Sequence, residues 1–127
     1  MSVASSVVSQ YDKVRQMAVK IQRDVASKMN VIMEGRDIGT VVLPWSKNKF
    51  FLTATSEERT SRRYKENIEK KIPTDFDMLL KEVKERDIRD TTRAHSPLKQ
   101  AEDAVFIDST KMTVNEVANK ILSNLKR

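Results

Sequence analysis

The chain has 127 residues and a net charge of +6, with 39% apolar residues, 33% charged residues and no cysteine. This length allows one ordinary domain with a core. The lack of cysteine excludes a disulfide scaffold and a zinc site of the Cys type. The positive charge is compatible with an anionic partner: a nucleotide, a nucleic acid or a membrane surface. No apolar stretch is long enough to cross a bilayer, and the first residues lack the pattern of a secretory signal, so we expect a cytoplasmic protein.

The first half of the chain predicts one helix and two strands. Residues 11–28 carry apolar side chains at helical spacing, which predicts an amphipathic helix. Two short apolar runs follow at 31–34 and 40–44, and we expect the first, which ends at a glycine, to be a strand. Trp45 follows a proline and is expected to pack against a turn. Residues 49–55 are rich in β-forming residues and predict a buried strand.

The second half alternates helices with a strand. Ser56 precedes two acidic residues, a pattern typical of a helix cap and its first turn. A long helix is expected to start near Thr74, a strand to lie around 105–108, and a closing helix to be capped by Thr113. Strands that alternate with helices predict an α/β fold with a mainly parallel sheet.

Three of the predicted strands end in polar segments, at 35–37, 53–55 and 108–110. Ligands of open α/β sheets bind beyond the carboxyl ends of the strands, so we expect a site where these segments meet. The only two glycines of the chain flank a charged pair in the segment 35–39. We expect them to let the backbone turn so that both charged side chains reach one ligand.

Arginines are concentrated in two blocks, at 58–64 and 84–93. In the second block, Arg86, Asp90 and Arg93 fall on one helix face at spacing i, i+4 and i+7. A solvated face of Arg–Asp pairs is the simpler interpretation, whereas guanidinium groups also match phosphate oxygens in bidentate fashion. The sequence contains no G-x-x-x-x-G-K-[ST] motif, so these 127 residues include no Walker loop to cradle a triphosphate.

Four segments, taken together, resemble the bacterial cytidylate kinases, which are CMP/dCMP kinases. They are "EGRDIGTVVLP", "FFLTATSEERTSRRY", "KERDIRDTTRAHSPLKQAEDAVFIDST" and "TVNEVANKIL". The resemblance implies the P-loop nucleoside-monophosphate-kinase fold, a parallel sheet with flanking helices and a lid, here incomplete at its N-terminus. It also implies transfer of a phosphoryl group from ATP to CMP or dCMP, with Mg²⁺. We expect one partial kinase domain over 1–127, with 1–30 in the monophosphate-binding region, about 59–95 in the lid, and the remainder as sheet core and closing helix.

The resemblance assigns residues to the CMP side of the site. Ser6, Arg15 and Asp37 match residues with which the family binds cytosine. A carboxylate can accept from the cytosine amino group, and arginine can donate to the ring nitrogen and carbonyl acceptors. Arg36 and Arg93 match arginines that hold the monophosphate, and they are the expected catalytic residues.

The resemblance also assigns the sugar and ATP contacts. Arg86 and Asp90 match a pair near the sugar of CMP. Arg59 and Arg63 resemble lid arginines that face ATP, and the segment 108–110 resembles the loop beside the adenine. No residue of this chain is expected to ligate a metal ion.

The family's P-loop part is missing from the matching segments, so we expect a carboxyl-terminal portion of such a kinase. The P-loop supplies much of the positioning and charge in phosphoryl transfer, so the isolated chain is expected to be inactive. The alternative is a non-catalytic nucleotide-binding or assembly half that pairs with a separate P-loop fragment. A basic nucleic-acid binder is a weaker alternative, because the sequence has no recognised nucleic-acid motif. A sheet that lacks its first strand predicts a marginal, aggregation-prone monomer.

Overall fold

The computed structural model describes residues 2–127, without the side chains of residues 2, 3 and 6. The chain divides into two compact units, and each is described by itself. The first unit comprises Met1–Lys49 and Ile88–Ala104, and the second comprises Phe50–Asp87 and Val105–Arg127. Among the described residues, none of the helices combines the length and apolar character needed to cross a membrane.

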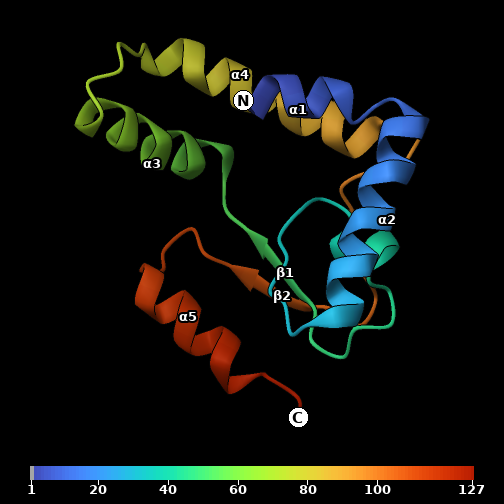
Figure 1. Cartoon of the computed structure of the whole chain (residues 1–127). Coiled ribbons are helices and arrows are strands. Elements are labelled where there is room, and N and C mark those ends of the chain that lie inside the picture. Colours follow the sequence, from blue (N-terminus) through green and yellow to red (C-terminus); the bar gives the residue numbers. More distant parts are fainter. Residues whose placement is uncertain (1) are drawn as a thin grey trace. The chain divides into compact units, whose positions relative to one another are not determined.

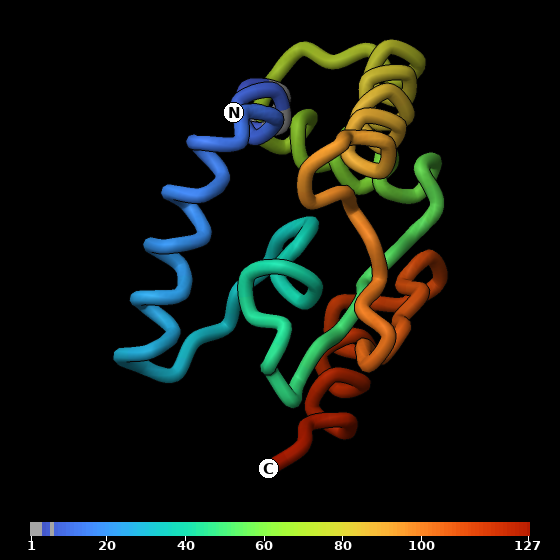
Figure 2. Tube along the Cα trace, turned by 90° about the vertical axis from the view of Figure 1, so that its right-hand side faces the viewer, coloured from blue at the N-terminus to red at the C-terminus, as the bar shows by residue number. Residues whose placement is uncertain are grey.

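The first unit is built around one long helix. It contains α1 (Ser2–Val8), α2 (Asp12–Lys28) and the short π-helix η1 (Ile38–Val42). The helix predicted at 11–28 is confirmed by α2. After α2 the chain turns back, and η1 contacts α2 (Figures 1 and 2). The side of α2 that carries Arg15 and Arg23 lies close to the segment from Gly35 to Val42.

Residues 31–34 form no strand, so the prediction of a strand before the Gly-Arg-Asp segment is wrong. A strand requires a neighbour with which to exchange hydrogen bonds. In the described part of the chain, the two existing strands pair only with each other, and Ile32 is fully exposed. The apolar run at 31–34 has the composition of a strand but lacks a partner.

The second apolar run, 40–44, lies mostly in η1 rather than in extended structure. The amides of Val41 and Val42 both donate to the main-chain carbonyl of Asp37, at 2.8 and 3.1 Å. π-helical turns are rare, short and frequent at functional sites. The unusual turn therefore fixes the backbone of Asp37.

The second unit contains a parallel pair of strands, β1 (Phe50–Thr53) and β2 (Val105–Asp108) (Figure 1). Both predicted strands and their parallel direction are confirmed. The expectation of a buried strand is wrong, because the residues of β1 are only partly buried and Leu52 is 53% exposed. The described sheet has only two strands, so β1 keeps an uncovered edge.

Three helices complete the chain: α3 (Ser56–Glu69), α4 (Phe76–Thr92) and α5 (Val114–Ser123). The predicted cap of α3 is displaced by one residue, because Thr55 rather than Ser56 accepts a hydrogen bond from the Glu58 amide. The start of α4 agrees with the prediction. The Asp75 carboxylate accepts from the Met78 amide at 2.8 Å, as expected for a residue that caps a helix.

A capping box begins α5, as the sequence predicted. The Thr113 hydroxyl accepts from the Glu116 amide at 3.2 Å, and the Glu116 carboxylate accepts from the Thr113 amide at 2.6 Å. Hydrogen bonds from the Thr113 backbone and side chain lower the pKa of Glu116. The ionised carboxylate therefore stabilises the folded chain above its unfolded pKa. That contribution is lost as the pH falls through the lower folded pKa.

We expect Thr113→Ala to lower the free energy of unfolding by roughly 1 kcal/mol, because the Glu116 amide loses its acceptor. Urea unfolding followed by circular dichroism at pH 7 measures this change. Thr113→Ser keeps a hydroxyl and should retain most of the stability. The gap between Thr113→Ala and wild type should shrink as acid protonates Glu116. Equal unfolding midpoints for wild type and Thr113→Ala at pH 7 would show that the cap does not hold α5.

Candidate functional site

Five of the predicted site residues lie together in the first unit, and we call them the charged cluster: Arg15, Arg36, Asp37, Asp90 and Arg93. One arginine comes from α2, a charged pair precedes η1, and the last two residues come from the end of α4 and the position after it. Three guanidinium groups and two carboxylates give the cluster one excess positive charge. This balance favours an anionic ligand.

Asp37 is fixed through both its side chain and its backbone. Its side chain forms an ion pair with Arg15 Nη2, and the residue is only 7% exposed. Arg15 Nη1 also donates to the Ser9 carbonyl at 3.4 Å. The carbonyl of Asp37 meanwhile accepts from the amides of Val41 and Val42, the last two residues of η1. The Arg15–Asp37 pair is therefore held in place before any ligand binds.

Asp90 is the buried centre of the charged cluster, with 2% exposure. Arg36 Nε donates to its Oδ2 at 3.0 Å, and Arg93 Nη1 lies 3.9 Å from its Oδ1. The Asp90 carbonyl accepts from the Leu98 amide at 2.7 Å, which folds the following loop onto the end of α4. The Arg36 side chain is 42% exposed, so it stays accessible to a ligand.

Arg93 is a buried cation among other cations. Burial lowers its pKa, and the nearby Arg15 and Arg36 lower it further, against the opposing effect of the two carboxylates. Arginine remains charged at any ordinary pH. Its positive charge is therefore partly removed from water and lies near two other cations, and a bound anion would offset both effects. The Arg93 Nε donates to the Ser96 carbonyl at 2.7 Å, and this bond fixes the side chain.

The glycines that flank the charged pair do not act as expected. Neither has a positive φ, so the turn does not depend on the conformational freedom of glycine. At Gly35 the reason is space, because a Cβ atom would lie 3.0 Å from the Ile38 side chain. A Cβ at Gly39 would make only an ordinary contact with the Lys49 stem, at 3.4 Å. A Cβ atom would therefore be crowded only at Gly35, where the Ile38 side chain would have to shift by a few tenths of an ångström.

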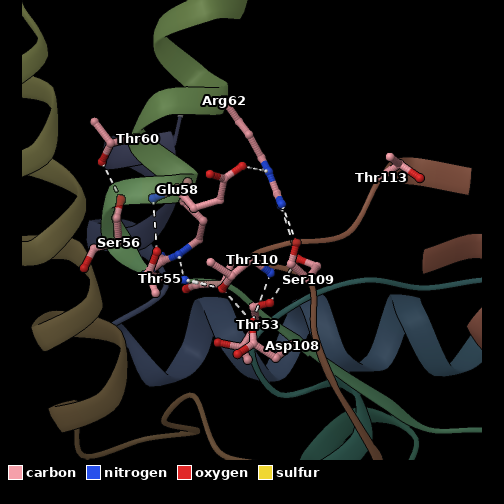
Figure 3. A network of polar contacts seen from close by, with 12 residues as sticks. Thr53, Thr55, Ser56, Glu58, Thr60, Arg62, Asp108, Ser109, Thr110 and Thr113 are labelled. Atoms are coloured by element: carbon pink, nitrogen blue, oxygen red, sulfur yellow. Dashed lines mark hydrogen bonds and ion pairs between the residues drawn. The ribbon is translucent and has the colours of Figure 1, made fainter. Parts of the chain in front are cut away.

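Two of the three predicted polar strand ends meet in the second unit. The Ser109 amide donates to the Thr53 carbonyl at 2.7 Å, and the Thr55 amide donates to the Thr110 hydroxyl at 3.1 Å (Figure 3). The third predicted end, at 35–37, lies in the first unit and follows no strand. The expectation of three strand ends on one sheet edge is therefore wrong, because 31–34 found no strand partner.

Arg62 ties α3 to this pair of strand ends, a contact the sequence analysis missed. Its Nη2 donates to the Ser109 carbonyl at 2.6 Å, and its Nη1 donates to the Ser109 hydroxyl at 3.2 Å (Figure 3). Its Nε donates to Glu58 at 2.9 Å. The i, i+4 spacing of Glu58 and Arg62 could have indicated their ion pair. No sequence signal points from Arg62 to Ser109.

The two predicted ATP residues lie together on α3. Both border an open cavity of about 550 Å³, whose lining residues are Arg59, Arg62, Arg63, Glu66, Asn67, Lys70 and Ile72. The guanidinium of Arg59 donates to both carboxylate oxygens of Asp87, at 2.8 and 2.6 Å. This bidentate pair raises the pKa of Arg59. The lining has four basic side chains and one acid, and two of these cations also pair with acids outside the lining, Arg59 with Asp87 and Arg62 with Glu58.

The two remaining residues predicted near CMP are Arg86 and Ser6. Arg86 lies on α4 and falls in the second unit. The side chain of Ser6 falls outside the described residues. Among the side chains that the structure describes, no three His, Asp or Glu groups come together as a metal site requires.

Sequence reasoning missed two cations that hold the segment around η1. Arg23, on α2, donates to the carbonyls of Val41 and Val42 at 2.8 and 2.9 Å. Its guanidinium lies 5.3 Å from the ring centre of Trp45, the residue predicted to pack against a turn. Lys49 is buried, and its Nζ donates to Asp103 at 2.9 Å and to the Pro44 carbonyl. Main-chain carbonyls as partners leave no pattern in the sequence.

Comparison with known proteins gives a single family. The model of the cytidylate kinase family matches residues 1–127. The cytidylate kinase of Lactococcus lactis subsp. cremoris is 51% identical over 98% of this chain and 56% of its own length. The cytidylate kinase of Caldicellulosiruptor saccharolyticus is 52% identical over 95% of this chain and 54% of its own length. The cytidylate kinase of Clostridium botulinum is 48% identical over 100% of this chain and 60% of its own length. The chain thus spans little more than half the length of these curated relatives, and it belongs to the cytidylate kinase family.

Proposed function

We propose that this chain is part of a kinase that transfers the γ-phosphoryl group of ATP to CMP or dCMP. The observation that carries the proposal is the charged cluster, which holds five of the residues predicted to bind CMP in one compact unit. The family match supports the same reaction. The cluster has one excess positive charge, as the site of an anionic nucleotide requires.

In this proposal the Arg15–Asp37 pair reads the base. The Asp37 carboxylate accepts from the cytosine amino group, and Arg15 donates to the N3 and carbonyl acceptors of the ring. Ser6 is proposed to assist at the base, and Arg86 with Asp90 to lie near the sugar. Uracil presents a carbonyl oxygen where cytosine has its amino group. The Asp37 carboxylate would repel that oxygen, so the pair favours cytosine.

Arg36 and Arg93 are proposed to hold the phosphate of CMP. An oxygen of that phosphate attacks the γ-phosphorus of ATP, and the bond from this phosphorus to the bridging oxygen of ADP breaks. ADP leaves with the electron pair. The two guanidinium groups position the attacking phosphate and offset the repulsion between it and the ATP phosphates.

Arg59 and Arg63 are proposed to contact ATP phosphates from the cavity on α3. We propose that Mg²⁺ enters the site with the ATP phosphates, as is common in kinases, and we route no step through a metal ion bound by this chain. The 127 residues include no Walker loop, so we propose that they bind CMP but do not catalyse the transfer alone.

We expect the isolated chain to bind CMP, and Asp37→Asn to weaken that binding at least tenfold because the amide donates where cytosine also donates. Isothermal titration calorimetry measures both affinities. Asp24→Asn is the matched control, since Asp24 lies exposed on α2 and pairs only with a surface lysine within the described structure. Unchanged CMP affinity in Asp37→Asn would contradict the assignment. Saturable ATP-dependent formation of CDP by the chain alone would contradict the proposed inactivity.

A second candidate function is that of an assembly half that pairs with a separate P-loop polypeptide. The observation that favours it is an exposed apolar stripe on α2, formed by Val14, Met17, Ile21 and Val25. An amphipathic helix normally buries such a stripe against a partner. About 44% of the length of the Lactococcus lactis subsp. cremoris relative lies outside the part that this chain matches. We propose that the stripe packs against this remaining part of the kinase, which includes the P-loop.

We expect activity when the chain is mixed with the P-loop part of a relative, made as a separate polypeptide. ATP- and CMP-dependent release of ADP measures it. Ile21→Glu should reduce this activity at least tenfold, because it places a charge in the apolar interface. Lys20→Glu, on the same helix outside the stripe, is the control and should have little effect. Absence of activity in a mixture of two folded parts would contradict the pairing.

A further inference from the structure

Two arginines of α2 contact the two ends of the short η1 turn. Arg15 pairs with the carboxylate of Asp37, which immediately precedes η1. Arg23 donates to the carbonyls of Val41 and Val42 at the end of η1. The two arginines are eight residues apart, about 12 Å along the helix axis. One helix therefore sets the position of both ends of η1.

The Arg23 contacts provide donors for main-chain carbonyls at the end of η1. A single π-helical turn leaves its last carbonyls without partners inside the helix. Val42 is 1% exposed, so an unpaired carbonyl there would be costly. Arginine presents several donors in a rigid plane, which suits two neighbouring carbonyls, and its charge complements the negative end of a helix. Trp45 lies against the same guanidinium and restricts its plane.

We propose that Arg23 is a positioning residue for cytosine recognition. It holds the carbonyl end of η1, and the amides of η1 hold the carbonyl of Asp37. Asp37 is thereby kept where its carboxylate meets Arg15. This inference rests on the proposed function, because that function assigns the Arg15–Asp37 pair to the base. Arg23 itself contacts the backbone of η1, so its proposed effect on the base is exerted through Asp37.

A residue that only adds stability would not affect the choice between bases, whereas Arg23 is expected to do so. Arg23 is exposed over much of its side chain, so its removal leaves the buried residues of the unit in contact. Loss of its two hydrogen bonds should make η1 more mobile and leave Asp37 less well positioned. The consequence is a loss of discrimination between cytosine and uracil. Affinity for the phosphate, which Arg36 and Arg93 are proposed to hold, should change little.

Arg23→Gln tests the proposal in the chain as it exists, with Lys20→Gln as a control for loss of one positive charge on α2. Hydrogen exchange of residues 37–43, measured without nucleotide, should accelerate at least tenfold in Arg23→Gln and stay unchanged in the control. The ratio of CMP to UMP affinity, from calorimetry, should fall at least tenfold. Binding of inorganic phosphate should be unaffected. Arg23→Lys, which keeps the charge but not the planar fork, should give intermediate exchange and an intermediate ratio.

Three results would overturn the proposal. Unchanged exchange in Arg23→Gln would show that Arg23 does not order η1. Faster exchange with an unchanged CMP/UMP ratio would show a merely structural role. A wild-type chain that binds CMP and UMP equally would contradict the cytosine assignment itself. Exchange would then still report whether Arg23 holds η1. If Arg23→Gln does not fold, Trp45→Leu serves instead and should produce a smaller change of the same kind in both measurements.

Discussion

The candidate site depends on the ion pair between the buried carboxylate of Asp90 and Arg36. Asp90 pairs with Arg36 from the segment before η1 and lies next to Arg93, while its carbonyl anchors the loop that follows α4. A carboxylate this deeply buried must be paired, because burying an isolated charge is strongly unfavourable. Two arginines from distant parts of the sequence are thereby brought to one place.

The charged cluster shows how a folded chain can prepare a site for an anion. Its two acids each hold an arginine, which keeps the cations close together and restricts their side chains before a ligand arrives. Binding is stronger when the ordering of side chains has already occurred on folding. Burial lowers the pKa of Arg93, and the neighbouring Arg15 and Arg36 repel its charge and lower that pKa further. A phosphate placed there would relieve that repulsion, which is the physical basis of the proposed CMP site.

The parts that the sequence predicted well are those set by local interactions. The cap of α5 is an example, because Thr113 and Glu116 are three residues apart and satisfy each other. The strand expected at 31–34 depended instead on a distant partner, which composition does not reveal. The acids and arginines of the charged cluster were found through their resemblance to a family. Arg23 was missed because its partners are main-chain carbonyls, which every residue carries.

The most direct test of this account is a double-mutant cycle between Arg36 and Asp90. The free energies of unfolding of wild type, Arg36→Gln, Asp90→Asn and the double variant are measured by urea denaturation at pH 7. Residues in direct contact typically show coupling of about 0.5 to 3 kcal/mol, and we predict a favourable coupling in that range. Additive effects of the two substitutions would contradict the claim that the Asp90 carboxylate holds Arg36 in the site.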